Sequence, residues 1–407
     1  MNEHAPTCPP LKIDLLTSAE QIDAIKPEWH DLSVAAARAS CFSSPSYFQA
    51  WHSAASKDVT WSVLIVRRNG ALIGVMPLMR TTAQRGPSCA PRHDFAPSDA
   101  RYLGENGVRP FKLCQISPVV SIPCALIGPA PLSAEKDMGI VMDAVTNHLV
   151  ELDNWDTFAV PTDQESGQDQ WKNALGRAGF SPWVLGLGRT ISGIEGILPF
   201  ADIVAGQNRN FRKNIRRANR AAQQAGLTIK VWQGADQVRA KLPVIANVAG
   251  QSWKAGNIEK GAAGGMHIPY DGIQREFVEA LVNLPNLDTD LTPVLAEAQT
   301  DGQPLAVLLS LRHGDRLTAI LTFHNLTFHN GRANTTSPGL LLIGRMIDWA
   351  HEHNLAGYDL NLTQNWARHL TNHVSQQNIV VCYANTLRGR VFSGISRAAR
   401  FRHKANT

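Results

Sequence analysis

The chain has 407 residues, of which 44% are hydrophobic and 18% are charged, so it is long enough for two or three domains with buried cores. Its net charge of +5 suits an anionic ligand or a membrane surface and does not require nucleic acid. The six cysteines form no CxxC pair and no zinc-ligand spacing with histidine, which argues against a disulfide framework and fits a reducing cytoplasm.

The first half of the chain contains a hairpin followed by a helix and a strand. Asn69-Gly70 separates the apolar runs Trp61–Val66 and Leu72–Leu78. Asn-Gly is typical of a tight hairpin, because both turn positions need positive φ. The later helix and strand are predicted over 136–152 and 156–160. Around these elements we expect helices over 18–39, 46–55 and 171–178, and a polar loop region over 81–111.

The same order recurs in the second half. Asp301-Gly302 separates Val294–Ala298 from Leu305–Leu311, and a helix over 340–353 precedes a strand over 358–362. The duplication implies two similar mixed α/β domains in tandem. We expect them at 12–194 and 195–375, with a C-terminal extension over 376–407. Other expected elements of the second half are strands over 228–232 and 317–323 and helices over 235–253 and 271–284.

One uncharged stretch, Leu113 to Ala134, raises the question of a membrane span. It contains Pro118, Pro123, Pro129 and Pro131, and prolines at that density break a helix. We therefore expect a buried strand and a Gly128-Pro129 turn here. The first residues lack the basic and apolar regions of a signal peptide, so a cytoplasmic location is expected.

Several motifs, in this order along the chain, resemble the GNAT superfamily in its double-domain form, near the FemAB-like proteins and the CelD-like acetyltransferases. The motifs are Phe42-Ser43-Ser44-Pro45 with Trp51, Arg68-Asn69-Gly70 through Leu78, Phe211 through Arg220, Ser252-Trp253-Lys254, Arg275-Glu276-Phe277, Ser337-Pro338-Gly339 and Tyr358-Asp359-Leu360. The usual glycine loop of GNAT enzymes is replaced by Ser337-Pro338-Gly339, and the tail after about residue 370 is outside the match.

The resemblance implies a fold of two tandem GNAT-like domains, each a twisted mixed sheet flanked by helices. It also implies an acyltransferase that moves an acyl group from acyl-CoA, as co-substrate, to a primary amine. Relatives act largely in cell-envelope pathways, so the expected acceptor is a long-chain or sphingoid-type lipid amine or an amino sugar. The alternatives are an aminoacyl-tRNA-dependent peptidoglycan ligase and a non-catalytic partner of a polysaccharide-synthesis complex.

The donor site is expected at the start of the helix over 340–353. A helix N-terminus offers unpaired N–H groups and a partial positive charge to a pyrophosphate, and Gly339 removes a side chain there. The candidate donor-binding residues are Ser337, Gly339, Leu340, Leu341 and Arg345. A capped helix without a ligand is the alternative interpretation.

Acyl transfer needs a base for the amine proton and a donor for the departing thiolate. His324, at the end of a predicted strand, is the candidate base. Asp359 is a candidate to orient a base or bind the amine, and Tyr358 to donate to the thiolate. The alternatives are that His324 is a turn residue and that Asp359 is a structural hydrogen-bonding residue.

The strongest charge feature is the segment 209–220. It contains six basic residues, and no acidic residue occurs from Ile203 through Ala235. Arg212 and Arg216 are candidates to bind an anion, such as a phosphate of coenzyme A, a phosphorylated acceptor or anionic lipid heads; the alternative is a solvated helix face. Trp253 and Lys254 are candidates to bind the acceptor. Peripheral membrane contact is considered, and nucleic acid is not an expected partner.

No bound metal and no permanent cofactor are expected. His351-Glu352-His353 with Asp348 is the nearest approach to a metal-binding set. Adjacent residues of a helix point in different directions, however, so these side chains are not expected to share one ion.

Overall fold

The computed structural model describes residues 11–36, 40–54, 59–85, 111–118, 132–153, 155–162, 165–252, 272–325, 338–362 and 367–394. They form two compact units of mixed α/β structure. Unit 1 is built from the described residues of Met1–Arg38, Ser56–Gly188 and Gln377–Thr407, and unit 2 from those of Ala39–Ala55 and Arg189–Gln376. The sequence predicts a division into contiguous domains, at 12–194 and 195–375, with an extension over 376–407. That division stays a prediction.

Unit 1 is a mixed sheet with helices packed against it. Its elements are β1 (Leu11–Leu16), α1 (Ala19–Ala35), β2 (Val59–Arg68), β3 (Ala71–Arg85), β4 (Phe111–Pro118), β5 (Leu132–Ser133), η3 (Glu135–Asp137), α3 (Met138–Glu151), β6 (Thr157–Thr162) and α4 (Glu165–Arg177). The strand order is β1-β2-β3-β4-β6, with β6 followed by a late strand, β13 (His373–Tyr383). Only the β4–β6 pair in this series is parallel.

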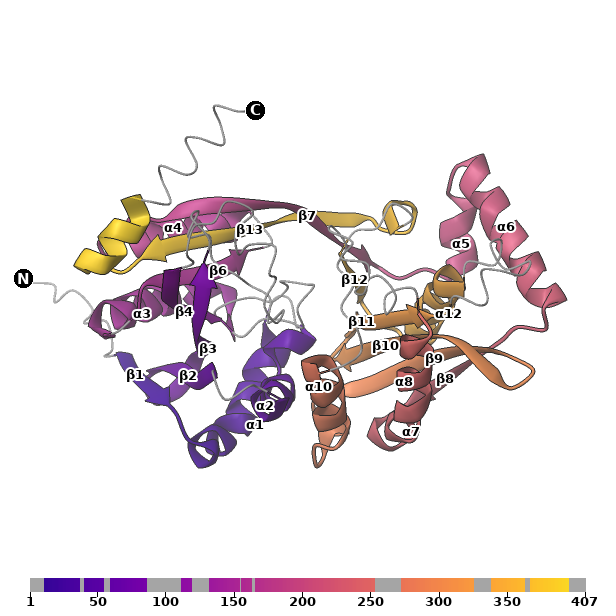
Figure 1. Ribbon diagram of the computed structural model, residues 1–407, viewed down its shortest axis with the longest axis horizontal. Coiled ribbons are helices and arrows are strands. Elements are labelled where there is room, and N and C mark those ends of the chain that lie inside the picture. The colour runs from indigo at the N-terminus through magenta and orange to yellow at the C-terminus, as the bar shows by residue number, and fades with distance from the viewer. Residues whose placement is uncertain are drawn as a thin grey trace, which may run out of the picture. The chain divides into compact units, whose positions relative to one another are not determined.

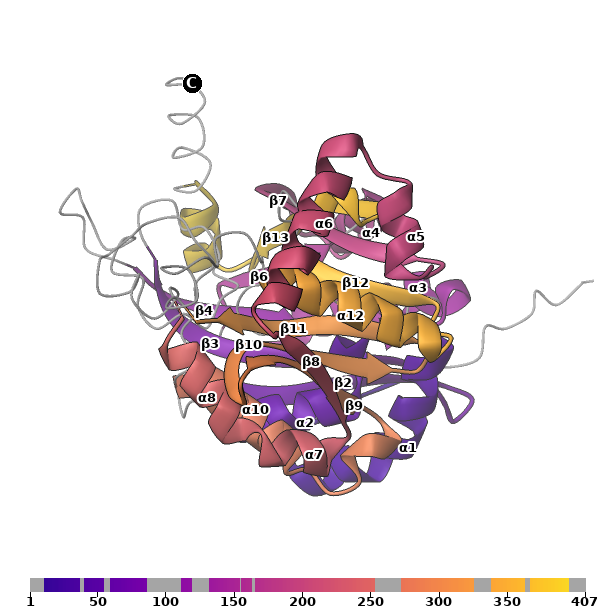
Figure 2. The ribbon, with the colours of Figure 1, turned by 90° about the vertical axis from the view of Figure 1, so that its right-hand side faces the viewer.

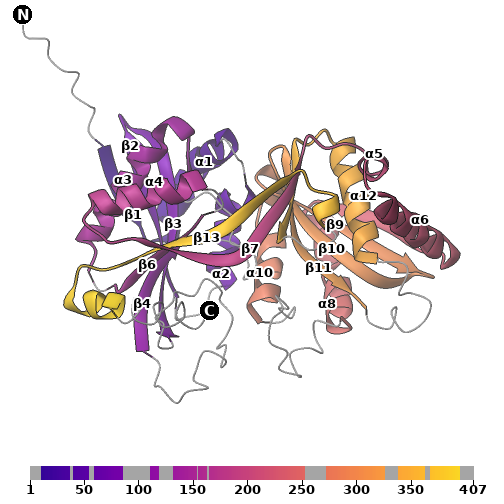
Figure 3. The same ribbon diagram turned by 90° about the horizontal axis from the view of Figure 1, so that it is seen from above.

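The core of unit 1 lies between its sheet and the helices α3 and α4, which lie side by side in Figure 3. Val141 and Val145 of α3 and Trp171 of α4 are buried against Phe158 of β6 and Met76 of β3. Burying these large side chains is what stabilises the unit, since each removes apolar surface from water.

Unit 2 repeats this plan. Its elements are η1 (Cys41–Ser43), α2 (Pro45–Ala54), α5 (Phe200–Ala205), α6 (Arg209–Gln224), β8 (Thr228–Gln233), α7 (Ala235–Ala240), α8 (Leu242–Gly250), α10 (Gly272–Val282), η4 (Leu287–Thr289), β9 (Thr292–Thr300), β10 (Gln303–His313), β11 (Arg316–His324), α12 (Pro338–Glu352), β12 (Gly357–Leu362) and η6 (Ala367–His369). The strand order is β8-β9-β10-β11-β12, and β12 pairs with the end of β7 (Trp183–Glu195).

The sheet of unit 2 has helices on both faces (Figure 1). Ala296 and Leu308 face α12, where they meet Leu342 and Met346. The next residue of β9, Glu297, points the other way, because side chains alternate along a strand. Glu297 meets Lys241, which lies between α7 and α8, with 2.9 Å between the Lys Nζ and a carboxylate oxygen.

The two units exchange their last strands. β7 follows the elements of unit 1 along the chain but ends as a sheet strand of unit 2, where Ile194 lies opposite Tyr358. β13 follows unit 2 but ends in the sheet of unit 1, where Val380 lies opposite Val160. Residues 377–383, which the sequence places in an extension, are therefore a strand of the unit 1 sheet.

Both predicted hairpins and the tandem mixed α/β fold are confirmed. Asn69 and Asp301 have φ of 52° and 49°, and the glycines that follow them have φ of 82° and 77°. Two expectations are wrong. Residues 81–85 continue β3 instead of opening a loop. The helix expected over 235–253 is two helices, α7 and α8, because Pro243 at the start of α8 cannot donate a backbone hydrogen bond.

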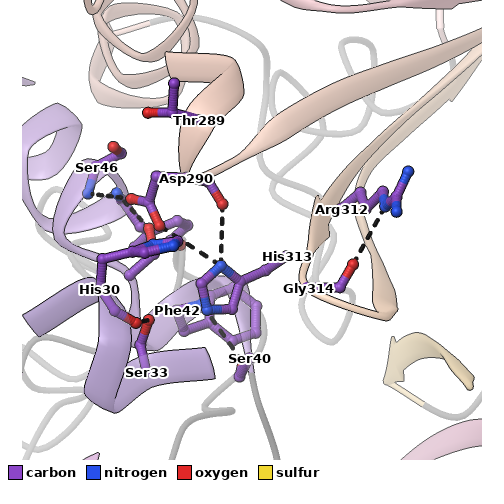
Figure 4. Close-up of polar contacts among 12 residues, drawn as sticks. His30, Ser33, Ser40, Phe42, Ser46, Thr289, Asp290, Arg312, His313 and Gly314 are labelled. Atoms are coloured by element: carbon purple, nitrogen blue, oxygen red, sulfur yellow. Dashed lines mark hydrogen bonds and ion pairs between the residues drawn. The ribbon is translucent and has the colours of Figure 1, made fainter. Parts of the chain in front are cut away.

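The segment 40–54 is held in unit 2 by a polar cluster and by aromatic packing. Asp290 accepts a hydrogen bond from the backbone N–H of Ser46 at 2.9 Å, and its carbonyl lies 3.1 Å from Nδ1 of the buried His313 (Figure 4). The rings of Tyr47 and Trp51 pack on Phe277 of α10, with centroids 5.0 and 5.1 Å apart. The α2 helix is thus part of the unit 2 core.

We predict that Phe277→Ala lowers the stability of unit 2 by about 3–5 kcal/mol, the usual cost of deleting a buried ring. Hydrogen exchange followed by mass spectrometry should show α2 and α10 losing protection together. Leu198→Ala, at a position that is 55% exposed, is the control and should change stability by less than about 0.5 kcal/mol. Retained protection of α2 in Phe277→Ala would contradict the packing described above.

Candidate functional site

The parallel pair β11–β12 separates part of the way along its length. Arg316, Leu317 and Thr318 lie opposite Gly357, Tyr358 and Asp359, and the pairing ends there. Both strands continue, β11 to His324 and β12 to Leu362. Backbone groups of the two facing edges are consequently left without each other as partners beyond Thr318, and polar groups of that kind are strong hydrogen-bonding sites for a ligand.

The helix that connects these two strands begins with unpaired donors. The first N–H groups of a helix have no partner within it, and Pro338 contributes none, which leaves those of Gly339 and Leu340. No acidic residue lies in the first turn. A β-carbon added at Gly339 would meet no atom within 4 Å, so the approach to this helix start is open. An anion is favoured at such a position.

The equivalent helix of unit 1, α3, starts differently. Glu135 and Asp137 immediately precede it, and the buried Asp137 carboxylate pairs with Arg68 at 2.7 Å. Two carboxylates of the protein itself therefore lie at the positive end of α3. This contrast favours the start of α12 over the start of α3 as the binding site of an anionic ligand.

Three strands of unit 2 meet at Arg316. Its guanidinium lies 2.9 Å from Glu195 of β7 and 2.9 Å from Asp359 of β12. Burial by itself would lower the pKa of this guanidinium, but hydrogen bonds and charges from the two carboxylates outweigh burial and raise its pKa above the ordinary value. A β-carbon added at Gly357 would lie 2.6 Å from Nη1 of Arg316, so a larger residue there would displace the guanidinium from its two carboxylates. Neither Arg316 nor Glu195 was expected from the sequence as a site residue.

Asp359 and Tyr358, two of the candidate catalytic residues, have structural partners. Asp359 makes an ion pair with Arg316. Tyr358 is completely buried, and its hydroxyl lies 3.3 Å from that of Ser310. Burial raises the pKa of the Tyr358 phenol, which keeps it protonated inside the core. Asp359 thus links β12 to β11, and Tyr358 links β12 to Ser310 of β10.

His324, the candidate base, is the last residue of β11 and is half-buried. It lies beyond the point where β11 and β12 separate. The next residue, Asn325, is buried and donates its side-chain amide to Gln251. This Asn325–Gln251 pair was not predictable from the sequence, because its members are 74 residues apart in the chain.

The candidate donor-binding residues do not all face the same way. Leu340 is half-buried, and Leu341 is buried against Ala218 and Ala222 of α6. Arg345 pairs with Glu352, which is 2.9 Å away and about two turns further along the helix. Of the predicted set, Gly339 and Leu340 are the members best placed at the open helix start. Ser337, Trp253 and Lys254 lie outside the described residues.

Arg212 and Arg216 lie on the exposed face of α6. A hollow of about 500 Å³ lies at the start of this helix and is lined by Asn208, Arg209, Asn210, Phe211, Asn214 and His369. The ring of His369 stacks on Phe211, with centroids 4.6 Å apart. The hollow therefore belongs to the junction of α6 and η6.

The four residues considered as a metal-binding set have separate partners. Asp348 accepts from the backbone N–H of Phe200, and Glu352 pairs with Arg345. Nδ1 of His351 lies 3.0 Å from the carbonyl of Ile197, and the ring of His353 stacks on Trp349. Within the described ranges, no group of three histidine, cysteine or acidic residues is arranged to hold a metal ion. The helices described there include none with the length and apolar character of a membrane span.

Comparison with known proteins identifies the domain in the second half of the chain. Residues 209–366 match the model of the acetyltransferase (GNAT) domain, so this part of the chain is a GNAT domain and the predicted resemblance is confirmed. The chain is accordingly an acyltransferase. No curated protein matches it in sequence.

Solved structures resemble the chain in fold over most of its length. A structure of FemX is 12% identical, with a TM-score of 0.57, and the match covers 94% of this chain and all of that one. The C-terminal domain of a putative lysylphosphatidylglycerol synthetase from Agrobacterium fabrum is 10% identical, with a TM-score of 0.50, and the match covers 88% of this chain and 92% of that one. At these identities the likeness shows the fold alone.

We predict that Arg316→Met destabilises unit 2 by about 2–4 kcal/mol, because it leaves two carboxylates without their cation while Glu195 remains partly in water. Arg345→Met is the matched control: the Arg345–Glu352 pair is more exposed and should contribute about 1 kcal/mol or less. Urea unfolding followed by circular dichroism measures both. Equal losses in the two variants would contradict a special role for Arg316.

Proposed function

We propose that unit 2 binds an acyl-CoA thioester and transfers its acyl group to a primary amine. The observation that carries this proposal is the separation of β11 from β12 beyond Thr318 and Asp359, next to the open start of α12. An extended thioester arm fits between two separated strand edges, because their free backbone groups can pair with its amides. A pyrophosphate fits the unpaired N–H groups at Gly339 and Leu340.

In the proposed reaction the amine nitrogen attacks the thioester carbonyl and forms a tetrahedral intermediate. Collapse of this intermediate breaks the carbon–sulfur bond, so the products are an amide and the thiol of coenzyme A. The amine has to lose a proton, and His324 at the end of β11 is the residue proposed to accept it. Backbone N–H groups along the separated part of β11 are proposed to stabilise the oxyanion.

Asp359 and Tyr358 have a different place in this proposal. Arg316 holds Asp359, and the core holds Tyr358, so neither is assigned a proton-transfer step. Their proposed contribution is to fix the position from which the two strands separate. The departing thiolate is then proposed to take its proton from solvent or from the protonated base.

The proposed acceptor class is a primary amine of a cell-envelope precursor, either a long-chain lipid amine or an amino sugar. One structural neighbour is described as a putative lysylphosphatidylglycerol synthetase, and phosphatidylglycerol is a lipid. Together with the basic face of α6, this supports a lipid-borne amine as the first class to test. We further propose a cytoplasmic protein that acts at a membrane surface and requires no bound metal or permanent cofactor.

We predict that Gly339→Trp abolishes acyl-CoA binding and turnover, because the indole fills the open helix start. The chain offers a matched control in Gly139, the second residue of α3, where an added β-carbon also meets nothing within 4 Å. Gly139→Trp should leave donor affinity within about threefold of wild type, a difference of less than about 0.7 kcal/mol. Calorimetric titration with acetyl-CoA and palmitoyl-CoA measures the affinities.

Each outcome of this comparison has a meaning. Loss of binding in Gly139→Trp alone would move the donor site to unit 1. Unchanged binding in both variants would remove both helix starts as donor sites. Failure of the wild type to bind either thioester, with amide formation from an aminoacyl-tRNA instead, would replace acyl-CoA as the donor.

We predict that His324→Gln lowers kcat by about 10²–10⁴-fold, the usual contribution of a general base. The decline of kcat toward low pH should also disappear, since glutamine does not titrate. The control is His52→Gln, at an exposed histidine on α2, which should retain the wild-type profile. A pH profile of His324→Gln with the wild-type shape would assign the base to another residue.

A further inference from the structure

The α6 helix presents a basic face that the proposed chemistry does not use. Its buried residues, Phe211, Ile215, Ala218 and Ala222, recur at spacings of three and four and form one stripe. Its basic residues are Arg209, Arg212, Lys213, Arg216, Arg217 and Arg220, and all six are exposed. At 3.6 residues per turn they lie on the side of the helix opposite the buried stripe and span about 16 Å of its length. We call this set the α6 basic face.

The α6 basic face points away from the body of unit 2. On the buried side, Ala218 and Ala222 contact Leu341 of α12, and Figure 2 shows the two helices next to each other. The basic residues lie on the opposite side of the helix and consequently face away from the start of α12. A small anion bound between α6 and α12 does not account for these basic residues.

None of the six basic residues makes an ion pair with a carboxylate in the part of the chain that the structure describes. Arg212 and Arg216 contact only backbone carbonyls, those of Ala205 and Arg212. No acidic residue occurs from Ile203 through Ala235 to compensate them. Six uncompensated charges on one exposed face produce a concentrated positive potential, which fits an extended anionic surface.

We infer that the α6 basic face docks the protein on the surface of an anionic phospholipid membrane. Clusters of four to eight basic residues on a helix are typical of binding to anionic lipids. An apolar contact accompanies the charges: Leu198, just before α5, is 55% exposed, and α5 packs beside α6. Single-stranded nucleic acid is the less favoured partner, because the aromatic residue of α6, Phe211, is buried and cannot stack on a base.

This docking surface deepens the proposed function, since it would place unit 2 beside lipid-borne amines, but its test does not depend on catalysis. The full chain is mixed with vesicles of phosphatidylcholine alone or with added phosphatidylglycerol, and bound protein is measured by sedimentation. We expect binding to the anionic vesicles only, weakening as salt screens the charges. Binding without acyl transfer would support the docking surface and reject the proposed function.

The decisive variant is Arg212→Gln/Arg216→Gln/Arg220→Gln, which removes three charges from the centre of the α6 basic face. Its partition to anionic vesicles should fall by about 100-fold. The matched control, Lys136→Gln/Lys230→Gln/Arg368→Gln, removes three exposed charges from other elements and should bind within about threefold of wild type. Circular dichroism and melting curves check that both variants are folded.

Three results would overturn the inference. They are equal binding by wild type and the α6 variant, equal losses in the two triple variants, and absence of wild-type binding to anionic vesicles. If the wild type ignored vesicles but bound RNA through the same three arginines, the partner would be a nucleic acid. If it bound neither, the α6 basic face would be a solvated surface.

Discussion

The ion pairs of Arg316 are the constraint on which the site in unit 2 depends. One guanidinium joins β11, β7 and β12 at the end where β11 and β12 begin, with both carboxylate contacts at 2.9 Å. A cation with two anionic partners tolerates partial burial that would be costly for an isolated charge. The glycine at 357 gives the guanidinium its space. The pair of parallel strands is therefore fixed at one end and free to separate at the other.

The two halves of this duplicated fold differ at the start of the connecting helix. Both units have a mixed sheet, a parallel pair of strands and a helix that connects them. In unit 2 the helix begins at Gly339 with open surroundings and no acidic first turn. In unit 1 the Arg68–Asp137 pair already lies at the helix start. The same backbone plan thus leaves the helix start of unit 2 available to an anionic ligand, whereas a carboxylate of the chain itself lies at the helix start of unit 1.

Local signals in the sequence predicted much of the fold and part of the site. The Asn69-Gly70 and Asp301-Gly302 turns determine their own φ angles, so both hairpins could be read directly. The start of α12 was also predictable, because proline is favoured at the first position of a helix and Pro338 stands there. The strand exchange of β7 and β13 was not readable, since apolar strands of similar length can pair in either unit. The burial of Tyr358 could not be predicted either. The same holds for the Arg316–Asp359 pair, because its two residues are 43 apart in the chain.

The central claim is that an acyl-CoA thioester binds at the start of α12, and site-resolved hydrogen exchange tests it most directly. The amides of Gly339 and Leu340 have no partner within the helix and should exchange fast in the free protein. Added acyl-CoA should slow these amides, together with those of the separated part of β11, and leave the first turn of α3 unchanged. Protection at α3 with no change at α12 would contradict the account.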